Sequence, residues 1–429
     1  MRAPLPQRPV EPLAHLSSEG IACPDCGLAQ LLPPVPPGAR AECRRCGRTL
    51  ARPALGGIAA ALALAAAALL LWPPACLANL FTVSSAGAIR DSALADGVTA
   101  LWSGGFPLLA GVVLAFSILV PSTYLALITG VLVGVRTTHT RTRLLGRLFR
   151  WALALRPWTM TEVYLLGACV AYSRVGQVAI VSVGPGGWCL IATTLCLLLL
   201  DAELDERSVW AVLPVAKDAQ RLAPLAAPAR APAVAIACDV CDLLHPAAQD
   251  GERCARCDSR LARRKPAALE RTWALIIAGF LLYIPANLLP VLSLERFGRD
   301  QPNTILGGVE ELVRFGLWPL AVIVFVASVL IPLMKLSALT CNLVLTQRRS
   351  AWLLPLRTRL HRAVDAVGRW SNIDVFMASI LVALVQFGAL MHVRADDGMV
   401  AFAAVVVLTM IAAKSFDSRL MWDAARESR

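Results

Sequence analysis

Eight of the 13 cysteines in this sequence lie in four Cys-x2-Cys pairs, which form two clusters of four. The members of the two clusters are, in chain order, Cys23, Cys26, Cys43 and Cys46, then Cys238, Cys241, Cys254 and Cys257. Two such pairs joined by a short hairpin can place four thiolates tetrahedrally around one Zn²⁺, at about 2.3 Å each. The spacing therefore predicts two structural metal sites with four protein ligands, holding zinc, or iron in a rubredoxin-like variant.

Other chemistry is open to cysteine pairs of this kind. A redox dithiol normally occurs singly in a thioredoxin-like βαβ context, and the sequence shows no such context. Basic ribbons also bind nucleic acid, but no aromatic stacking platform accompanies the arginines beside the first cluster. Zinc ribbons without a nucleic-acid partner are the favoured interpretation. A membrane redox or stress-response protein that uses its thiols, and a zinc-dependent membrane scaffold, remain the alternatives.

The segments between the clusters are those of a membrane protein. The chain has 429 residues, 57% hydrophobic and 16% charged, whereas a soluble domain has about 25% charged residues. A membrane span needs about 20 predominantly apolar residues. Eight spans are predicted, at 54–81, 105–135, 161–182, 187–201, 272–292, 316–345, 374–392 and 399–413. Pro121 and Pro332, inside the second and sixth, predict kinks.

Arginine distribution predicts the orientation of these spans. The loops at 136–156 and 346–370 contain six arginines each, whereas the loops on the opposite side contain few basic residues. Cytoplasmic loops carry the excess of positive charge in membrane proteins. We therefore expect a multi-pass protein of the bacterial inner membrane, with both termini and both ribbons in the cytoplasm.

The chain repeats itself at a shift of 211–212 residues, which pairs the second half of each cysteine cluster, Trp158 with Trp370, and Glu162 with Asp374. The predicted fold is an all-α polytopic membrane protein made of two tandem repeats. Each repeat comprises a small rubredoxin-like β zinc ribbon and four transmembrane helices. The predicted domains are a first ribbon (1–53), a first four-helix module (54–210), a second ribbon (211–266) and a second module (267–429).

Four polar residues of the second module form a predicted transmembrane site. A charge within a span costs about 2.5–3.5 kcal/mol, so it normally has a partner or a function. Lys335 lies inside the sixth span, and Asp374, expected at the cytoplasmic start of the seventh, is its predicted counter-ion. Ser328 lies two helical turns before the lysine, and Thr409 of the eighth span could join them. The site would contact a phospholipid headgroup or a coupling proton; the alternative is a salt bridge that only fixes packing.

Two further polar residues in spans have structural interpretations. Asn287 completes the candidate site and is expected to cap a helix that Pro285 and Pro290 interrupt. Arg174 lies inside the third span, too far along the helix from Glu162 for a direct pair. It is expected to pack, or to face a water-filled cavity.

Several motifs of the second half identify a family resemblance. They are the runs IPAN at 284–287, TILGG at 304–308, IPLMKL at 331–336, WSNIDVF at 370–376 and SFDSRLMW at 415–422. With the two cysteine clusters they resemble the paraquat-inducible protein A (PqiA/LetA-like) family of inner-membrane lipid-transport proteins. The resemblance implies a separate periplasmic partner built of MCE domains, to which phospholipid is loaded or from which it is received, in support of outer-membrane integrity. The first half departs from the pattern, with Cys76, Tyr124 and Leu197 where the second has Asn287, Lys335 and Thr409.

Motifs of catalysis are missing from the sequence. It has no GxxxxGK[ST] phosphate loop, no HExxH and no Ser/His/Asp arrangement, and its five histidines are scattered. We expect a transport component and not an enzyme.

Overall fold

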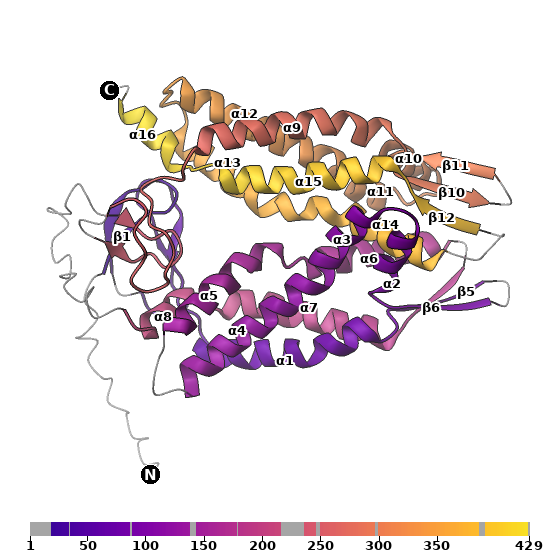
Figure 1. Cartoon of the computed structure of the whole chain (residues 1–429), viewed down its shortest axis with the longest axis horizontal. Helices are drawn as coiled ribbons and strands as arrows, with labels where there is room; N and C mark the ends of the chain where they lie inside the picture. Colours follow the sequence, from indigo (N-terminus) through magenta and orange to yellow (C-terminus); the bar gives the residue numbers. More distant parts are fainter. Residues whose placement is uncertain are drawn as a thin grey trace, which may run out of the picture.

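The computed structural model describes residues 19–33, 35–85, 88–137, 143–177, 179–215, 236–245, 249–296, 299–385 and 391–427. Parts of both predicted ribbon domains, 1–18 and 216–235, lie outside these residues. The helices form two halves side by side, with the cysteine clusters at one end and two small β-sheets at the other (Figure 1). We call these the ribbon end and the sheet end. The predicted class, a helical membrane protein with two repeats and two small ribbons, is confirmed.

Short antiparallel strand pairs build the ribbons. The first ribbon contains β1 (Glu19–Ala22), β2 (Ala29–Leu32), β3 (Ala41–Glu42) and β4 (Thr49–Ala51). The second contains β8 (Ile236–Ala237), β9 (Leu244–His245) and one bridge between Arg253 and Arg260. Such small sheets bury little apolar surface, so they depend on the cysteine cluster between them.

The first half follows the first ribbon. Its helices are α1 (Gly57–Leu77), α2 (Asp96–Ser103), α3 (Pro107–Leu114), α4 (Val120–Thr137), α5 (Arg143–Leu155), α6 (Thr161–Val175), α7 (Pro185–Glu203) and α8 (Glu206–Val212), with a π-helical turn η1 (Ala115–Leu119) and a 3₁₀ turn η2 (Arg156–Trp158). At the sheet end, β5 (Phe81–Ser85) pairs antiparallel with β6 (Ala88–Ser92) and with β7 (Ile180–Val183).

The second half repeats this order. Its helices are α9 (Ala268–Leu288), α10 (Ile305–Arg314), α11 (Trp318–Phe325), α12 (Ile331–Gln347), α13 (Leu354–Val367), α14 (Ile373–Leu384), α15 (Asp397–Ser415) and α16 (Arg419–Glu427), with a π-helical turn η5 (Val326–Leu330) and a 3₁₀ helix η6 (Gly368–Asn372). The sheet has β10 (Leu292–Arg296) between β11 (Arg299–Asn303) and β12 (Met391–Ala395).

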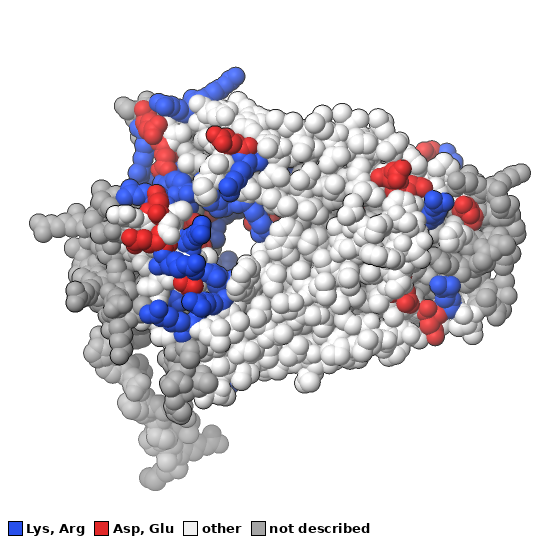
Figure 2. Space-filling view, in the orientation of Figure 1, with Lys and Arg blue, Asp and Glu red and all other residues white. Residues whose placement is uncertain are grey.

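Seven helical stretches in the described residues are long and apolar enough to cross a membrane. They are Gly57–Leu77, Pro107–Thr137, Pro185–Glu203, Ala268–Leu288, Trp318–Gln347, Leu354–Leu384 and Asp397–Ser415. Figure 2 shows the uncharged band that they form, with lysine and arginine gathered at the ribbon end. The chain is a multi-pass membrane protein.

The predicted third and seventh spans need correction. The third, 161–182, is a 15-residue helix, α6, and its chain continues into β7. The seventh begins far earlier than residue 374, because α13, η6 and α14 form one stretch from Leu354. The predicted loop at 346–370 therefore contains a helix, and one of its arginines is buried: Arg357 donates to the side chains of Asn342 and Thr346.

Proline has milder effects than the sequence suggests. Pro285 lies inside α9, which continues to Leu288, so the expected break is not formed. At Pro121 and Pro332 the preceding turn widens to a π-helix, which accommodates the missing N–H donors.

Helices α6 and α14 pack at the centre of the molecule and join the two halves. Positions equivalent under the repeat meet there: the Asn372 side chain contacts the Met160 sulfur at 2.8 Å, and the rings of Tyr164 and Phe376 lie 5.4 Å apart. Since each contact joins a residue to its own repeat equivalent, the internal two-fold axis runs between these helices. Gly167 permits the close approach, because a Cβ there would lie 3.1 Å from the Ile373 carbonyl oxygen.

Replacing Gly167 with alanine should therefore destabilise the protein by about 1–3 kcal/mol, the usual cost of overpacking a core. Gly130→Ala is the matched control: Gly130 lies in α4, nothing lies within 4 Å of its added Cβ, and alanine favours the helix. The measurement is thermal unfolding of the purified protein in detergent. An equal midpoint for the two variants would show that α6 and α14 do not pack as described.

Candidate functional site

The eight predicted metal ligands form two buried clusters. In each cluster the four sulfur atoms lie within 4.8 Å of one another. The shortest Sγ–Sγ distances are 3.5 Å for Cys23 and Cys46 and 3.5 Å for Cys238 and Cys257. A tetrahedron with arms of about 2.3 Å has edges of about 3.8 Å, so both clusters fit a tetrahedral thiophilic metal ion.

Local backbone geometry explains why the cysteines converge. In the first ribbon, Gly27 and Gly47 follow the second cysteine of each pair with φ of +68° and +67°. Their equivalents in the second ribbon, Asp242 and Asp258, adopt the same left-handed conformation, with φ of +56° and +62°. Aspartate tolerates this conformation better than most residues, which is why the second ribbon forms the same turns without glycine.

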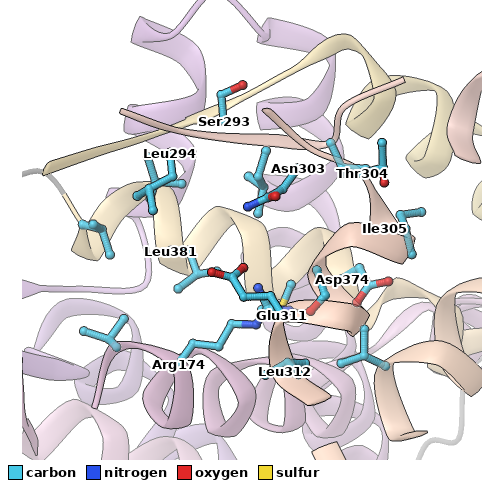
Figure 3. Close-up of a pocket in the computed structure, with 18 of the residues that line it drawn as sticks. Arg174, Ser293, Leu294, Asn303, Thr304, Ile305, Glu311, Leu312, Asp374 and Leu381 are labelled. Carbon is cyan, nitrogen blue, oxygen red and sulfur yellow. Dashed lines mark hydrogen bonds between the residues drawn. The ribbon is translucent and has the colours of Figure 1, made fainter. Parts of the chain in front are cut away.

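A cavity of about 290 Å³ lies at the sheet end of the second half. Its walls come from β10, β12 and the helices α10, α11 and α14, and most of its lining is apolar (Figure 3). The end of α6 in the first half supplies Arg174, so both halves build this cavity. An apolar chamber with a few charged groups suits an amphiphilic molecule.

Three charged residues face one another in this cavity. Figure 3 shows Arg174 extending toward Glu311, with Asp374 beside them. Asp374 and Glu311 are the acidic groups near enough to act on the arginine, although neither is within 4.0 Å of it among the described ion pairs. Arg174 Nη2 donates to the Gly308 carbonyl at 3.3 Å.

Several polar atoms of this group have no partner. Both carboxylate oxygens of Asp374, which is 4% exposed, and Nε of Arg174 are buried without a hydrogen bond to any described residue. Burying such groups unpaired costs several kcal/mol in sum, so their persistence indicates a bound polar group or water.

The predicted ion pair between Lys335 and Asp374 is not formed. Lys335 Nζ donates instead to the Gly368 carbonyl oxygen at 3.1 Å. The lysine lines a second cavity, of about 240 Å³, together with Asp365 and Lys414 of its own half and Arg156 and Asp201 of the first. The predicted pair of Lys335 and Asp374 was wrong because the stretch that contains Asp374 begins at Leu354. Asp374 therefore lies further from the ribbon end than expected, in the sheet-end cavity.

The 3₁₀ helix η6 separates the two cavities. Its first residue, Gly368, lines the cavity with Lys335, and Asp374 lines the other cavity two residues after its end. Short 3₁₀ segments within long helices often mark functional hinges. A movement of η6 would therefore displace both the Gly368 carbonyl, which accepts from Lys335, and Asp374 in the sheet-end cavity.

The other predicted site residues bond within their own helices. Ser328 and Thr409 are fully buried and donate to the Val324 and Val406 carbonyls, respectively. Asn287 donates to the Tyr283 carbonyl at 2.8 Å near the end of α9. None of the three lines either cavity.

Arg174 lines a cavity, as one of the two alternatives expected for it, but sequence reasoning missed Glu311. The acidic partner of the arginine was sought only on the same helix. Glu162 pairs instead with Arg369 of the second half, at 2.9 Å. Charges at these positions interact across the halves, which a single-helix argument cannot reveal.

Comparison with known proteins gives the chain a context. The model of the family described as paraquat-inducible protein A matches residues 58–213 and 269–426, one match in each half. The chain is 34% identical to the intermembrane transport protein PqiA of Escherichia coli K12, over 96% of this chain and 98% of that protein. It is 28% identical to the lipophilic envelope-spanning tunnel protein A of the same organism, over 94% and 91% of the two chains. No solved structure matches it.

Proposed function

The chain belongs to the paraquat-inducible protein A family, and from that premise we propose that it is a non-enzymatic component of an intermembrane lipid transport system. It would reside in the bacterial inner membrane and load phospholipid into, or receive it from, a periplasmic tunnel made of MCE domains. The names of its relatives, an intermembrane transport protein and an envelope-spanning tunnel protein, support transport between membranes.

The sheet-end cavity carries this proposal. Its apolar walls suit acyl chains, and the unbonded Nε of Arg174 and carboxylate of Asp374 suit the phosphate and the amine of a zwitterionic headgroup. Opposite charges on one side of an apolar chamber fix the orientation of such a ligand. A small hydrophilic metabolite would instead place its polar atoms against a lining that is mostly apolar.

Charge distribution supports the proposed orientation. Arginines of α5 and α13, and those of the two ribbons, lie at the ribbon end (Figure 2). The positive-inside rule then places that end in the cytoplasm and the two sheets in the periplasm. In this orientation the lipid cavity opens on the side where a periplasmic MCE partner would collect or deliver its cargo.

Zinc is the proposed ion of the two cysteine clusters, as a structural element of the ribbons. Four thiolates in a closed tetrahedral site leave no position for substrate, which is typical of structural zinc. Hydrogen bonds from the thiols of Cys23 and Cys26 lower the pKa of Cys46. Thiolate is the form that binds metal.

Purification from membranes followed by mass spectrometry of bound lipid tests the proposal. The wild-type protein should retain phospholipid, and the affinity of Arg174→Ala should be lower by about tenfold or more, because a charge-assisted contact contributes about 1.5–3 kcal/mol. Arg314→Ala is the control: Arg314 lies on α10 near the same cavity, but its pair with Glu310 is exposed and contributes little. Equal lipid in wild type and Arg174→Ala would contradict the assignment of the cavity.

A further inference from the structure

The first ribbon packs on the half of the molecule to which it does not lead. It leads into α1 of the first half, yet Arg362 of α13 donates to the Cys46 carbonyl at 3.0 Å, and Ser418 donates to the Asp25 carbonyl at 2.9 Å. The second ribbon leads into α9 and contacts both halves: its Asp258 pairs with Arg147 of α5 at 3.1 Å, and its Asp239 pairs with Arg419 of α16 at 3.0 Å.

Asp25 is the centre of the first of these contacts. It lies between two cysteine ligands, and the residue is 6% exposed. Arg48 of the ribbon approaches one oxygen at 2.6 Å, and Arg362 approaches the other at 3.3 Å. The guanidinium of Arg45 also stacks over the Trp422 ring, 5.3 Å from its centre. These groups hold their positions only while the ribbon is folded around its metal.

Helix α13, which the first ribbon contacts, is continuous with the segment that lines the sheet-end cavity. Arg362 lies on α13, which continues into η6 between the two cavities and then into α14 with Asp374. A ribbon that releases α13 would free the segment that positions Lys335 against Gly368. Metal occupancy at the first ribbon is thus connected to the second half through a continuous stretch of chain.

The two metal centres differ in the hydrogen bonds that reach their sulfur atoms. In the second cluster, Ser259 Oγ lies 3.1 Å from the sulfurs of both Cys238 and Cys257, and His245 Nε2 lies 3.4 Å from Cys254. A thiolate only accepts, so these side chains are the donors. In the described part of the chain, the sulfurs of the first cluster have side-chain hydrogen bonds only with one another. Loss of such outer partners typically costs about 10–100-fold in metal affinity.

We propose that the first ribbon is the exchangeable metal centre of the pair and that, while loaded, it clamps the second half of the chain through Asp25 and Arg362. The second ribbon, with Ser259 and His245 as donors to its sulfurs, keeps its metal and its contacts with the first half. Loss of the first metal then loosens α13 without unfolding the membrane helices. The inference rests on the metal loading proposed above.

Chelation of the purified full-length protein tests this directly. The starting protein should contain two equivalents of zinc by elemental analysis, and excess EDTA should remove them in two phases of one equivalent each, separated by about tenfold or more in rate. Hydrogen–deuterium exchange after the fast phase should rise in α13 and stay unchanged in its repeat equivalent, α5.

Substitutions in each ribbon show which metal site gives rise to which phase of zinc release. A double substitution, His245→Ala with Ser259→Ala, should accelerate the slow phase only, whereas His392→Ala, in the distant strand β12, should change neither. Asp25→Asn should keep both metal equivalents yet raise exchange in α13, because it weakens the clamp without removing a ligand.

The outcomes separate two failures. Protein that contains no metal would overturn the zinc assignment itself. Two equivalents that leave in one phase, or a fast phase that leaves exchange in α13 unchanged, would overturn the clamp while the zinc assignment stands.

Discussion

Replacing Asp374 with alanine is expected to reduce lipid transport by roughly tenfold or more, while the protein still inserts into the membrane. The carboxylate lies in the sheet-end cavity with both oxygens free of hydrogen bonds to described residues, so it is available to a ligand. Removing a carboxylate that has no hydrogen bond to a described residue costs the fold little, and removing one that contacts the lipid costs transport. The measurement is transfer of phospholipid from inner-membrane vesicles to the purified periplasmic partner.

Lys335→Ala should give a similar loss through the other cavity, because Lys335 fixes Gly368 at the start of η6. Glu310→Gln is a control for both variants, since Glu310 lies on the exposed face of α10. Membrane fractions must contain equal amounts of each variant. Normal transport by both Asp374→Ala and Lys335→Ala would eliminate the polar site as a part of the transport mechanism.

Replacing Cys254 with serine should remove one metal equivalent and unfold the second ribbon. Structural zinc contributes apparent binding energies of about 10–16 kcal/mol, far more than the few short strands of a ribbon can supply. Asp258 and Asp242 would then lose their positions beside Arg147 and Arg207 of the first half. Elemental analysis and limited proteolysis of the ribbon measure the two effects.

Cys341→Ser is the matched control, because Cys341 is an exposed single cysteine on α12. It should keep both metal equivalents and the wild-type cleavage pattern. A Cys254→Ser protein with two equivalents of metal and an intact second ribbon would show that the cluster is not a metal site.

The sequence predicted the features that depend on local pattern. Cysteine spacing identified both clusters, and long apolar runs identified most of the spans, because each is recorded in neighbouring residues. Interactions between distant segments were predicted less well. The pairing of Lys335 with Asp374 failed because arginines of α13 find partners in the fold, so a segment rich in arginine became a helix instead of a loop.

The same limit explains the incomplete prediction of the site. Arg174 and Asp374 belong to different repeats, and nothing in their spacing indicates that α6 and α14 cross on the internal axis. The break expected at Pro285 did not form: proline near the C-terminal end of α9 removes one N–H donor, and the helix continues to Leu288.

The docking of the first ribbon imposes an order on biosynthesis. This ribbon leaves the ribosome before α1, but the surface that receives it includes Arg362 and Ser418, which are made more than 300 residues later. Because chains are synthesised from the N-terminus, the ribbon must wait undocked while the helices of both modules are made. Its complete docking therefore follows the synthesis of the second module, and truncated chains released early would lack it.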